Sequence, residues 1–473
     1  MRRKLSRYFS GGRWLAYVFL LCVLPTGLGL IYTTPMCEVP DEPGHVVRAD
    51  GLLHGQILGV TPPGKTTKGQ VLIDRGALQA CLDELWPSFP DHPLPVAARQ
   101  KAQGEHWGQL TYWPTNMVQY FPALYLPGAL GIGLGHLAGT GPLKALYLGR
   151  VGMLASFLLM GFIALQLAAF GRPILFVLLT LPMTLELAAS LNQDGQLIAA
   201  TALSAALLTG GERKRDWGLA LFSLVLCAKP PYIPLLLAWL LPFRGPGLWR
   251  RAQKVALAAI PPVLWLALMV KFSFAPWPRP HYHPGPLWPG SHSIWMTKTS
   301  LADNLTCLLA HPWQIILLPL NTLQVFWPNL KPAIIGVFGW GPVQMQPWAY
   351  PAWTITMTTA FVGVLLTPRN EWHQEAAAFI VILLLLTFLL MSLSLYLSWT
   401  NVGETLIAGI NGRYYLLFVP FAVLALPGLG RHLPPRWSIR LAALCCLPAI
   451  IMAAVDIVAL PKLLLHAYGS TGF

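Results

Sequence analysis

The chain has 473 residues, of which 55% are hydrophobic and only 11% are charged. A soluble globular domain carries about 25% charged residues, so this composition excludes an ordinary soluble protein. Apolar runs of about 18 residues or more recur along the chain and predict an all-α, polytopic membrane protein. The formal net charge is +14, but most Lys and Arg residues stand in short clusters between apolar runs. That arrangement is typical of membrane orientation signals and argues against nucleic-acid binding.

The first apolar stretch, at about 14–33, follows a basic N-terminus. It is long for the apolar part of a signal peptide, and no small-residue cleavage site follows it. We therefore interpret it as an uncleaved first span of a single integral membrane domain, residues 1–473. About eleven spans are expected in total. In chain order they cover about 14–33, 150–170, 174–190, 196–209, 217–228, 230–243, 255–273, 352–367, 375–397, 413–428 and 439–460.

The basic clusters predict the orientation of these spans, because Lys and Arg concentrate in cytoplasmic loops. With the N-terminus in the cytoplasm, every strongly basic cluster falls on that side. Most acidic residues fall on the exported side, which carries two long loops at about 34–149 and 274–350. The clustered cations are Arg2, Arg3, Lys4, Arg7, Arg213, Lys214, Arg215, Arg250, Arg251, Lys254, Arg431, Arg436 and Arg440.

Two further apolar stretches, at 120–139 and 311–327, fit poorly as full spans. The first is rich in proline and glycine, and a proline interrupts the second. If either crossed the membrane alone, the basic clusters after it would move to the exported side. We therefore expect helices that lie at the outer interface or dip partway into the membrane.

The seven cysteines are scattered, without a C-x-x-C pair or metal-ligand spacing. Cys37 and Cys81 share the first exported loop, so a disulfide can form between them, but the sequence leaves this pairing open. The other five are interpreted as small apolar residues in or near spans.

The motif VPDEPGH puts two adjacent acids directly outside the first span. Partial desolvation where membrane meets water raises the pKa of a carboxyl towards the range useful for a general base. Pro40 and Pro43 discourage a helix across the pair. We expect Asp41 and Glu42 to be catalytic and His45, which can hydrogen-bond a carboxylate or phosphate, to bind substrate. The alternative is an ordinary solvated start of a loop.

Three more candidates are distant in sequence but map to the same outer face. Asp194, in SLNQDGQL, can bind a ligand, cap the fourth span, or do both. Lys229, in CAKPPY, is costly in an apolar stretch, which favours a phosphate or carboxylate partner over simple extension to the interface. Arg413, followed by Tyr414, presents a fork suited to phosphate at the outer start of the tenth span. Its alternative is an interfacial arginine in an aromatic belt. The convergence with Asp41 predicts one site.

Other polar residues carry less information. Glu186 and Asp456 fall within spans and are expected to be paired inside the bundle. His281 and His283 have H-x-H spacing in a proline-rich loop, which does not settle whether a metal binds. The GIGLG motif at 131–135 is no nucleotide fingerprint, because no βαβ pattern surrounds it, and the chain has no Walker A motif.

Several motifs together resemble one known family. VPDEPGH, YFPALYLPGALG, LPMTLELAASLNQDG, AKPPYIPLLL, GVFGWG and GINGRYYLLFVP occur in the order seen in a large family of bacterial polytopic proteins. That family was long catalogued as a domain of unknown function and is placed in the GT-C glycosyltransferase superfamily. The resemblance covers nearly the whole chain. It departs at Asn411, where the family usually has Gln before Gly-Arg-Tyr, and at Gly44, where Ala is commoner.

The resemblance implies a GT-C-like helical bundle in the bacterial inner membrane, with its active site on the outer face. It also implies an inverting transferase that takes a sugar from a polyprenyl-phosphate donor. The acceptor would be a hydroxyl of a cell-surface glycan or glycolipid. Asp41 is then the expected base, and Glu42 resembles the second acid of the D-E pair in protein O-mannosyltransferases. Some GT-C enzymes need a divalent cation and others do not, so Mg²⁺ or Mn²⁺ is left open, as is the oligomeric state.

In this hypothesis the lipid tail of the donor stays among the membrane lipids and presents its phosphate at the outer interface. Arg413 and Lys229 stabilise the phosphate as the sugar leaves. Asp41 accepts the proton of the acceptor hydroxyl, and Glu42 or His45 orients Asp41 or the sugar. Two other classes are considered, a flippase or exporter of lipid-linked sugars and a non-catalytic scaffold in polysaccharide assembly. A transporter should show midplane ionisable residues and a repeat, and the sequence gives little sign of either.

Overall fold

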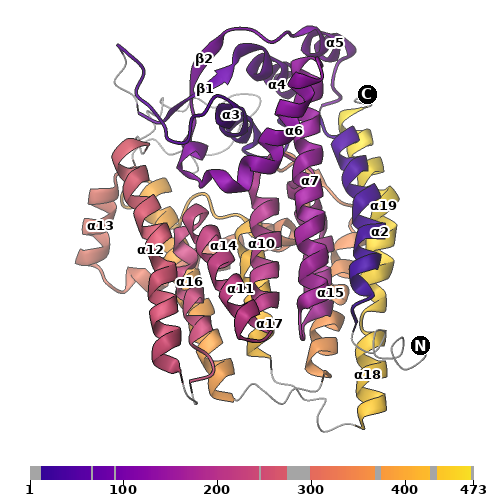
Figure 1. Ribbon diagram of the computed structural model, residues 1–473, viewed down its shortest axis with the longest axis vertical. Helices are drawn as coiled ribbons and strands as arrows, with labels where there is room; N and C mark the ends of the chain where they lie inside the picture. The colour runs from indigo at the N-terminus through magenta and orange to yellow at the C-terminus, as the bar shows by residue number, and fades with distance from the viewer. Residues whose placement is uncertain are drawn as a thin grey trace.

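The structure is a computed structural model that describes residues 12–64, 68–89, 92–243, 247–273, 299–367, 374–426 and 434–469. Upright helices form a bundle, and a cap built from the segment between the first two long helices covers one end of it (Figure 1). Within the described residues, helices account for nearly all regular structure, beside two small antiparallel sheets of two strands each. The expectation of an all-α membrane protein is confirmed at this level.

The elements outside the cap are α2 and all described elements from α7 to the last helix, α19. Their bounds are α2 (Leu15–Thr33), α7 (Pro142–Leu167), α8 (Arg172–Thr180), α9 (Pro182–Ala188), α10 (Gln193–Leu208), α11 (Glu212–Ala228), η3 (Pro230–Leu240), α12 (Leu248–Phe272), α13 (Leu301–Ala310), α14 (Gln314–Ile335), β3 (Val337–Phe338), β4 (Val343–Gln344), α15 (Ala349–Leu365), α16 (Gln374–Trp399), η5 (Gly412–Phe418), α17 (Val419–Ala425), α18 (Pro435–Leu444) and α19 (Leu447–Tyr468).

Five described stretches are long and apolar enough to cross a membrane. They are Leu15–Thr33, Pro142–Leu167, Leu248–Phe272, Ala376–Trp399 and Arg440–Tyr468. The other expected spans correspond to shorter or broken helices, so the count of about eleven stays a prediction.

Prolines explain two of the breaks. The stretch expected as the third span divides at Leu181 into α8 and α9, because Pro182 has no N–H to continue the helix. The expected break in the CAKPPY motif is present. Helix α11 ends at Ala228, Lys229 is non-helical, and η3 begins at Pro230. Lys229 therefore lies at a bend between two helices and belongs to neither of them.

Three helix boundaries differ from the predicted ones by eight residues, and one of them is the end of α19 at Tyr468 instead of about 460. Helix α7 begins at Pro142 instead of about 150, because Arg150 is a fully buried helical residue and does not mark a loop. Helix α14 continues to Ile335, beyond the expected end near 327. The stretch 120–139 is helical as predicted, as a 3₁₀ turn followed by a helix that packs along α7. A Cβ at Gly131 would lie 2.3 Å from the carbonyl oxygen of Leu148, so glycine permits this close approach.

The cap contains a two-stranded sheet that the sequence did not reveal, with two helices between its strands in the chain. Its strands are antiparallel, in a register that runs from Gln70 opposite Pro114 to Asp74 opposite Leu110. A disulfide between Cys37 and Cys81 joins the segment after α2 to α4 and settles the pairing left open above. The cap elements are α3 (Glu42–Leu53), β1 (Gln70–Asp74), α4 (Arg75–Ser88), α5 (Val96–Gly104), β2 (Leu110–Pro114), η1 (Asn116–Gln119), η2 (Pro122–Tyr125) and α6 (Leu126–Leu137).

The GVFGWG motif supplies β3 and the turn of a short antiparallel hairpin, β3–β4. Gly339 has a φ of +58°, and a Cβ there would lie 2.1 Å from the hydroxyl of Tyr468. Its N–H donates to Glu186 at 2.7 Å, so this buried acid bonds to the backbone of the hairpin. The motif thus joins α9 to the C-terminal helix.

Basic residues gather at the end of the bundle opposite the cap. Helices α11, α12 and α18 begin at that end, where α2 also begins (Figure 1). The described cations of the starting turns of α11 and α12 are Arg213, Lys214, Arg215, Arg250, Arg251 and Lys254. The predicted clusters at residues 2–7 and 431 and the side chain of Arg436, like His281 and His283, lie outside the described residues.

Candidate functional site

Asp41 lies at the N-terminus of α3, directly after the chain leaves α2. Its φ of 66° and ψ of −1° are left-handed, a conformation that few residues other than glycine adopt but that Asp tolerates. Pro40 and Pro43 were expected to keep both acids out of a helix. Asp41 is indeed non-helical, but helix α3 starts at Glu42. The side chain of Asp41 is 37% exposed, whereas Glu42 is fully buried. The left-handed turn therefore separates two adjacent acids into an accessible one and an inaccessible one.

Four charged side chains from four elements meet here and form a continuous charge chain, defined as Asp41, Arg413, Asp194 and Lys229. Arg413 Nη2 donates to Asp41 Oδ2. Arg413 Nε lies 3.4 Å from Asp194 Oδ2. Lys229 Nζ lies 3.3 Å from Asp194 Oδ1. The structure thus brings together residues separated by up to 372 positions. Asp41 has the most exposed side chain of the four, and the other three are mostly buried. Solvent therefore reaches the charge chain at Asp41, the residue expected to act as the base.

Local hydrogen bonds place the members of the charge chain. Asn192 caps α10, because its side chain accepts from Asp194 N at 2.9 Å, and its Nδ2 donates to the carbonyl of Pro40 at 3.0 Å. The alternative in which Asp194 caps the helix is therefore wrong, and its carboxylate is free to pair with cations. Asn411 plays the same part for η5, since its Oδ1 accepts from Arg413 N at 3.1 Å. Asparagine in place of the usual Gln thus provides a cap.

Aromatic rings enclose the two cations. Lys229 Nζ lies 5.3 Å from the ring centre of Tyr120 and 4.8 Å from that of Tyr414. The guanidinium of Arg413 lies 5.6 Å from the ring of Tyr414. These distances suit cation–π attraction, which helps to hold buried cations in place. Sequence reasoning missed Tyr120. Its place at the start of the YFPALYLPGALG motif was the one available signal.

His45 lies beside two of the tyrosines near the site, Tyr120 and Tyr125. Its Nδ1 is 2.7 Å from the hydroxyl of Tyr125, and its ring stacks on Tyr120 at 6.2 Å. Burial lowers the pKa of His45 to about 4, so the imidazole is neutral at physiological pH. A neutral, buried imidazole orients Tyr120 and does not supply a positive charge for a phosphate.

Glu42 is held by a buried fork from Arg150. Arg150 Nε donates to one carboxylate oxygen at 2.8 Å and Nη2 to the other at 2.6 Å. The backbone N–H groups of Cys37 and Leu191 donate to the same carboxylate at 3.1 and 2.9 Å. Arg150 also donates to the carbonyls of Thr34 and Pro35. Glu42 therefore fixes the turn that carries Asp41 and has no accessible oxygen of its own.

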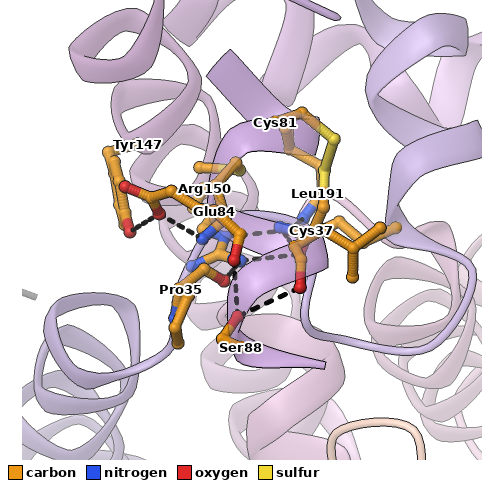
Figure 2. Close-up of a disulfide and its surroundings, with 11 residues drawn as sticks. Pro35, Cys37, Cys81, Glu84, Ser88, Tyr147, Arg150 and Leu191 are labelled. Carbon is orange, nitrogen blue, oxygen red and sulfur yellow. Dashed lines mark hydrogen bonds and ion pairs between the residues drawn. A yellow bond between two sulfur atoms is a disulfide. The ribbon is translucent and has the colours of Figure 1, made fainter. Parts of the chain in front are cut away.

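A second buried acid cluster supports the same turn. Glu84 accepts from Met36 N at 2.6 Å, from the hydroxyl of Tyr147 at 2.9 Å, and from Arg99. The hydroxyl of Ser88 donates to Glu38 at 2.7 Å. Figure 2 shows this cluster beside the Cys37–Cys81 disulfide and Arg150. The segment between α2 and α3 is therefore anchored on both sides, which preorganises Asp41.

The acids of the site do not fit a divalent cation. Asp41 and Asp194 already pair with Arg413 and Lys229, and Glu42 pairs with Arg150. Across the described part of the chain, no group of three or more His, Cys, Asp or Glu side chains is placed to hold a metal ion. These acids are therefore not arranged to bind Mg²⁺ or Mn²⁺.

A family model of predicted membrane proteins, DUF2142, matches residues 24–425. The chain belongs to the DUF2142 family. Neither a curated protein nor a solved structure matches it significantly. The charge chain and its Arg150–Glu42 support all lie within the DUF2142 region.

The first prediction concerns the buried fork. Replacing Arg150 by Met leaves the carboxylate of Glu42 buried without a counter-charge, and we expect a loss of about 3–5 kcal/mol of stability. The matched control is Lys254→Ala, because the Lys254–Asp216 pair is exposed and should contribute less than about 1 kcal/mol. Unfolding of the detergent-solubilised protein measures both. Equal effects of the two substitutions would contradict the assignment of Glu42 as a support.

The second prediction is a pH dependence of stability. Burial raises the pKa of Glu38 to about 8, whereas an unfolded Glu titrates near 4.3. The unfolded chain therefore loses this proton first, and stability falls as pH rises between about 4.3 and 8, by up to about 1.4 kcal/mol per pH unit. Glu38→Gln keeps an oxygen for Ser88 and should reduce this fall. Unfolding midpoints at pH 5, 6, 7 and 8 test it, with the exposed Glu212→Gln as control. An unchanged profile in Glu38→Gln would refute the assignment.

Proposed function

We propose that this DUF2142 protein is an inverting glycosyltransferase of the GT-C type. It transfers a sugar from a polyprenyl-phosphate donor to an acceptor hydroxyl at the outer face of the bacterial inner membrane. The observation that carries the proposal is the accessible carboxylate of Asp41 directly beside the cations of the charge chain, at the junction of cap and bundle. An accessible acid in contact with a cation is what this transfer requires.

The donor phosphate takes the place of the carboxylates on the two cations. The fork of Arg413 suits two phosphate oxygens, and Lys229 adds a point charge. Negative charge grows on the phosphate as the bond from the anomeric carbon to the phosphate oxygen breaks. The cations stabilise that charge and polyprenyl phosphate is released.

The acceptor approaches Asp41 from the solvent side. Its hydroxyl oxygen forms a bond to the anomeric carbon on the face opposite the phosphate, which inverts that carbon. The hydroxyl proton passes to the carboxylate of Asp41. Glu42 and Arg150 keep the turn in place, and His45 and Tyr125 keep Tyr120 in place, so the reacting carboxylate needs little reorganisation.

Two features favour an orientation in which the cap faces the exported side. Disulfides persist in oxidising compartments, and Cys37–Cys81 lies in the cap. The basic residues at the start of α11 and α12 lie at the opposite end, as expected of the cytoplasmic side. Together they support the placement of Asp41 on the exported side.

The alternatives are a flippase or exporter of lipid-linked sugars and a non-catalytic scaffold. Both would use the same cations to hold a lipid phosphate, but neither needs a base beside it. The exposure of Asp41 next to Arg413 favours the transferase.

The third prediction tests the base. Asp41→Asn retains the left-handed turn, since Asn tolerates it, but cannot accept a proton. We expect transfer to fall at least about 100-fold while expression, insertion and donor binding stay normal. The assay uses purified protein in lipid with a panel of polyprenyl-phosphate sugars, and the control is Asp216→Asn at the opposite end. Wild-type transfer by Asp41→Asn would eliminate the mechanism. Donor binding without transfer by the unmodified protein would favour the alternatives.

The fourth prediction separates the two substrates. Arg413→Ala removes the phosphate fork, so we expect a larger rise in KM for the donor than for the acceptor, with lower kcat. Lys229→Ala should act in the same direction. Steady-state kinetics with each substrate varied in turn measure this split. A change confined to the KM of the acceptor would contradict the role of Arg413.

A further inference from the structure

A groove of about 280 Å³ lies on the cap between α4 and β2. Helix α4 contributes side chains at spacings of three and four residues, which share one helix face. Thr111 and Trp113 share one face of β2. The lining residues are Arg75, Leu78, Gln79, Leu82, Gln109, Leu110, Thr111 and Trp113.

The walls of this groove are fixed by main-chain bonds. Asp74 caps α4, since its Oδ1 accepts from the N–H groups of Gly76 and Ala77 at 2.8 and 3.2 Å. Its Oδ2 accepts from Gly108 N at 2.9 Å. Arg75 N donates to the carbonyl of Gln109 at 3.1 Å, which ties the helix to the start of β2. A preformed groove loses little entropy when a ligand binds.

The chemistry of the lining residues suits a saccharide. Trp113 is 39% exposed, lines the groove and has a large apolar ring. The guanidinium of Arg75, the amide of Gln109 and the hydroxyl of Thr111 supply donors and acceptors around it. A sugar ring has an apolar C–H face and a rim of hydroxyls, and so matches this combination. Among the described lining residues there is one cation and no acid, so acidic sugars are also accepted.

Strand β2 leads from the groove to the site. After the strand ends, the hydroxyl of Thr115 lies 3.4 Å from the carbonyl oxygen of Gly44, in the first turns of α3. The chain then reaches Tyr120, which faces Lys229. Seven residues separate Trp113 from Tyr120, so they are at most about 25 Å apart. A short oligosaccharide spans that distance.

We propose that this groove is a second glycan-binding site, which holds the acceptor chain some distance from its reacting hydroxyl. The identity of the ligand as an acceptor rests on the proposed glycosyltransferase function. The groove lets the enzyme select a chain of a certain length over a free monosaccharide. Trp113 is the main contact, and Arg75 and Gln109 bind hydroxyl or acidic groups.

The test uses the full-length protein in lipid nanodiscs, with Asp41→Asn present to prevent turnover. The probes are fragments of one to eight sugars released from the surface polysaccharide of the cells that make the protein. Titration followed by saturation-transfer NMR should show binding that strengthens with length. Trp113→Ala should weaken the binding of long fragments about tenfold. The matched control is Trp86→Ala, because Trp86 is 60% exposed and belongs to α4, which contributes to the groove, but does not itself line it.

Kinetics provide a second measurement. In the protein with Asp41 intact, Trp113→Ala should raise the KM for long acceptors and leave kcat and short acceptors unchanged. Equal binding by Trp113→Ala and Trp86→Ala, or binding of unstructured peptides in preference to the fragments, would overturn the proposal. Sugar transfer without any fragment binding would refute the glycan-binding role of the groove and leave the proposed function. Fragment binding that depends on Trp113, without any transfer, would refute the proposed function and leave the glycan-binding role.

Discussion

The fork between Arg150 and Glu42 is the interaction on which the site depends. Both side chains are fully buried, so each would be strongly destabilising without the other. The pair is tolerated because both side chains are fully hydrogen-bonded. Glu42 accepts four hydrogen bonds, and Arg150 also donates to two carbonyls at the end of α2. These bonds connect the end of α2, the start of α3, helix α7 and Leu191 just before α10. One carboxylate thus fixes the relative position of the elements that carry Asp41 and Asp194.

The convergence of the site could be predicted from the sequence because topology alone decides it. Once the basic clusters orient the spans, Asp41, Lys229 and Arg413 must all come to one end of the bundle, and the structure brings them into one charge chain. Pairwise partners were harder to predict. Either polar residue of the motif around Asn192 and Asp194 can cap a helix, and only the backbone path shows that Asn192 does so. Asp194 then becomes the anion between the two cations.

What the sequence concealed follows from short-range geometry. Asp41 and Glu42 are adjacent and chemically alike, and a single left-handed residue sends one side chain outwards and the other inwards. The buried partner of Glu42 was likewise not predicted, because Arg150 stands 108 positions further along the chain. The β1–β2 sheet lies in a polar loop without the strong alternation that marks a strand, and α4 and α5 stand between its two strands.

The distance along the chain between Asp41 and Arg413 sets the order in which this protein can be completed. Both cysteines of the cap disulfide are made early, because they stand only 44 residues apart near the start of the chain. Arg413 is made 372 residues after Asp41, when almost the whole chain has left the ribosome. Until Arg413 is made, Asp41 lacks the cation with which it pairs in the complete structure. A chain that stops before η5 therefore contains both cysteines of the cap disulfide but not the arginine of the charge chain.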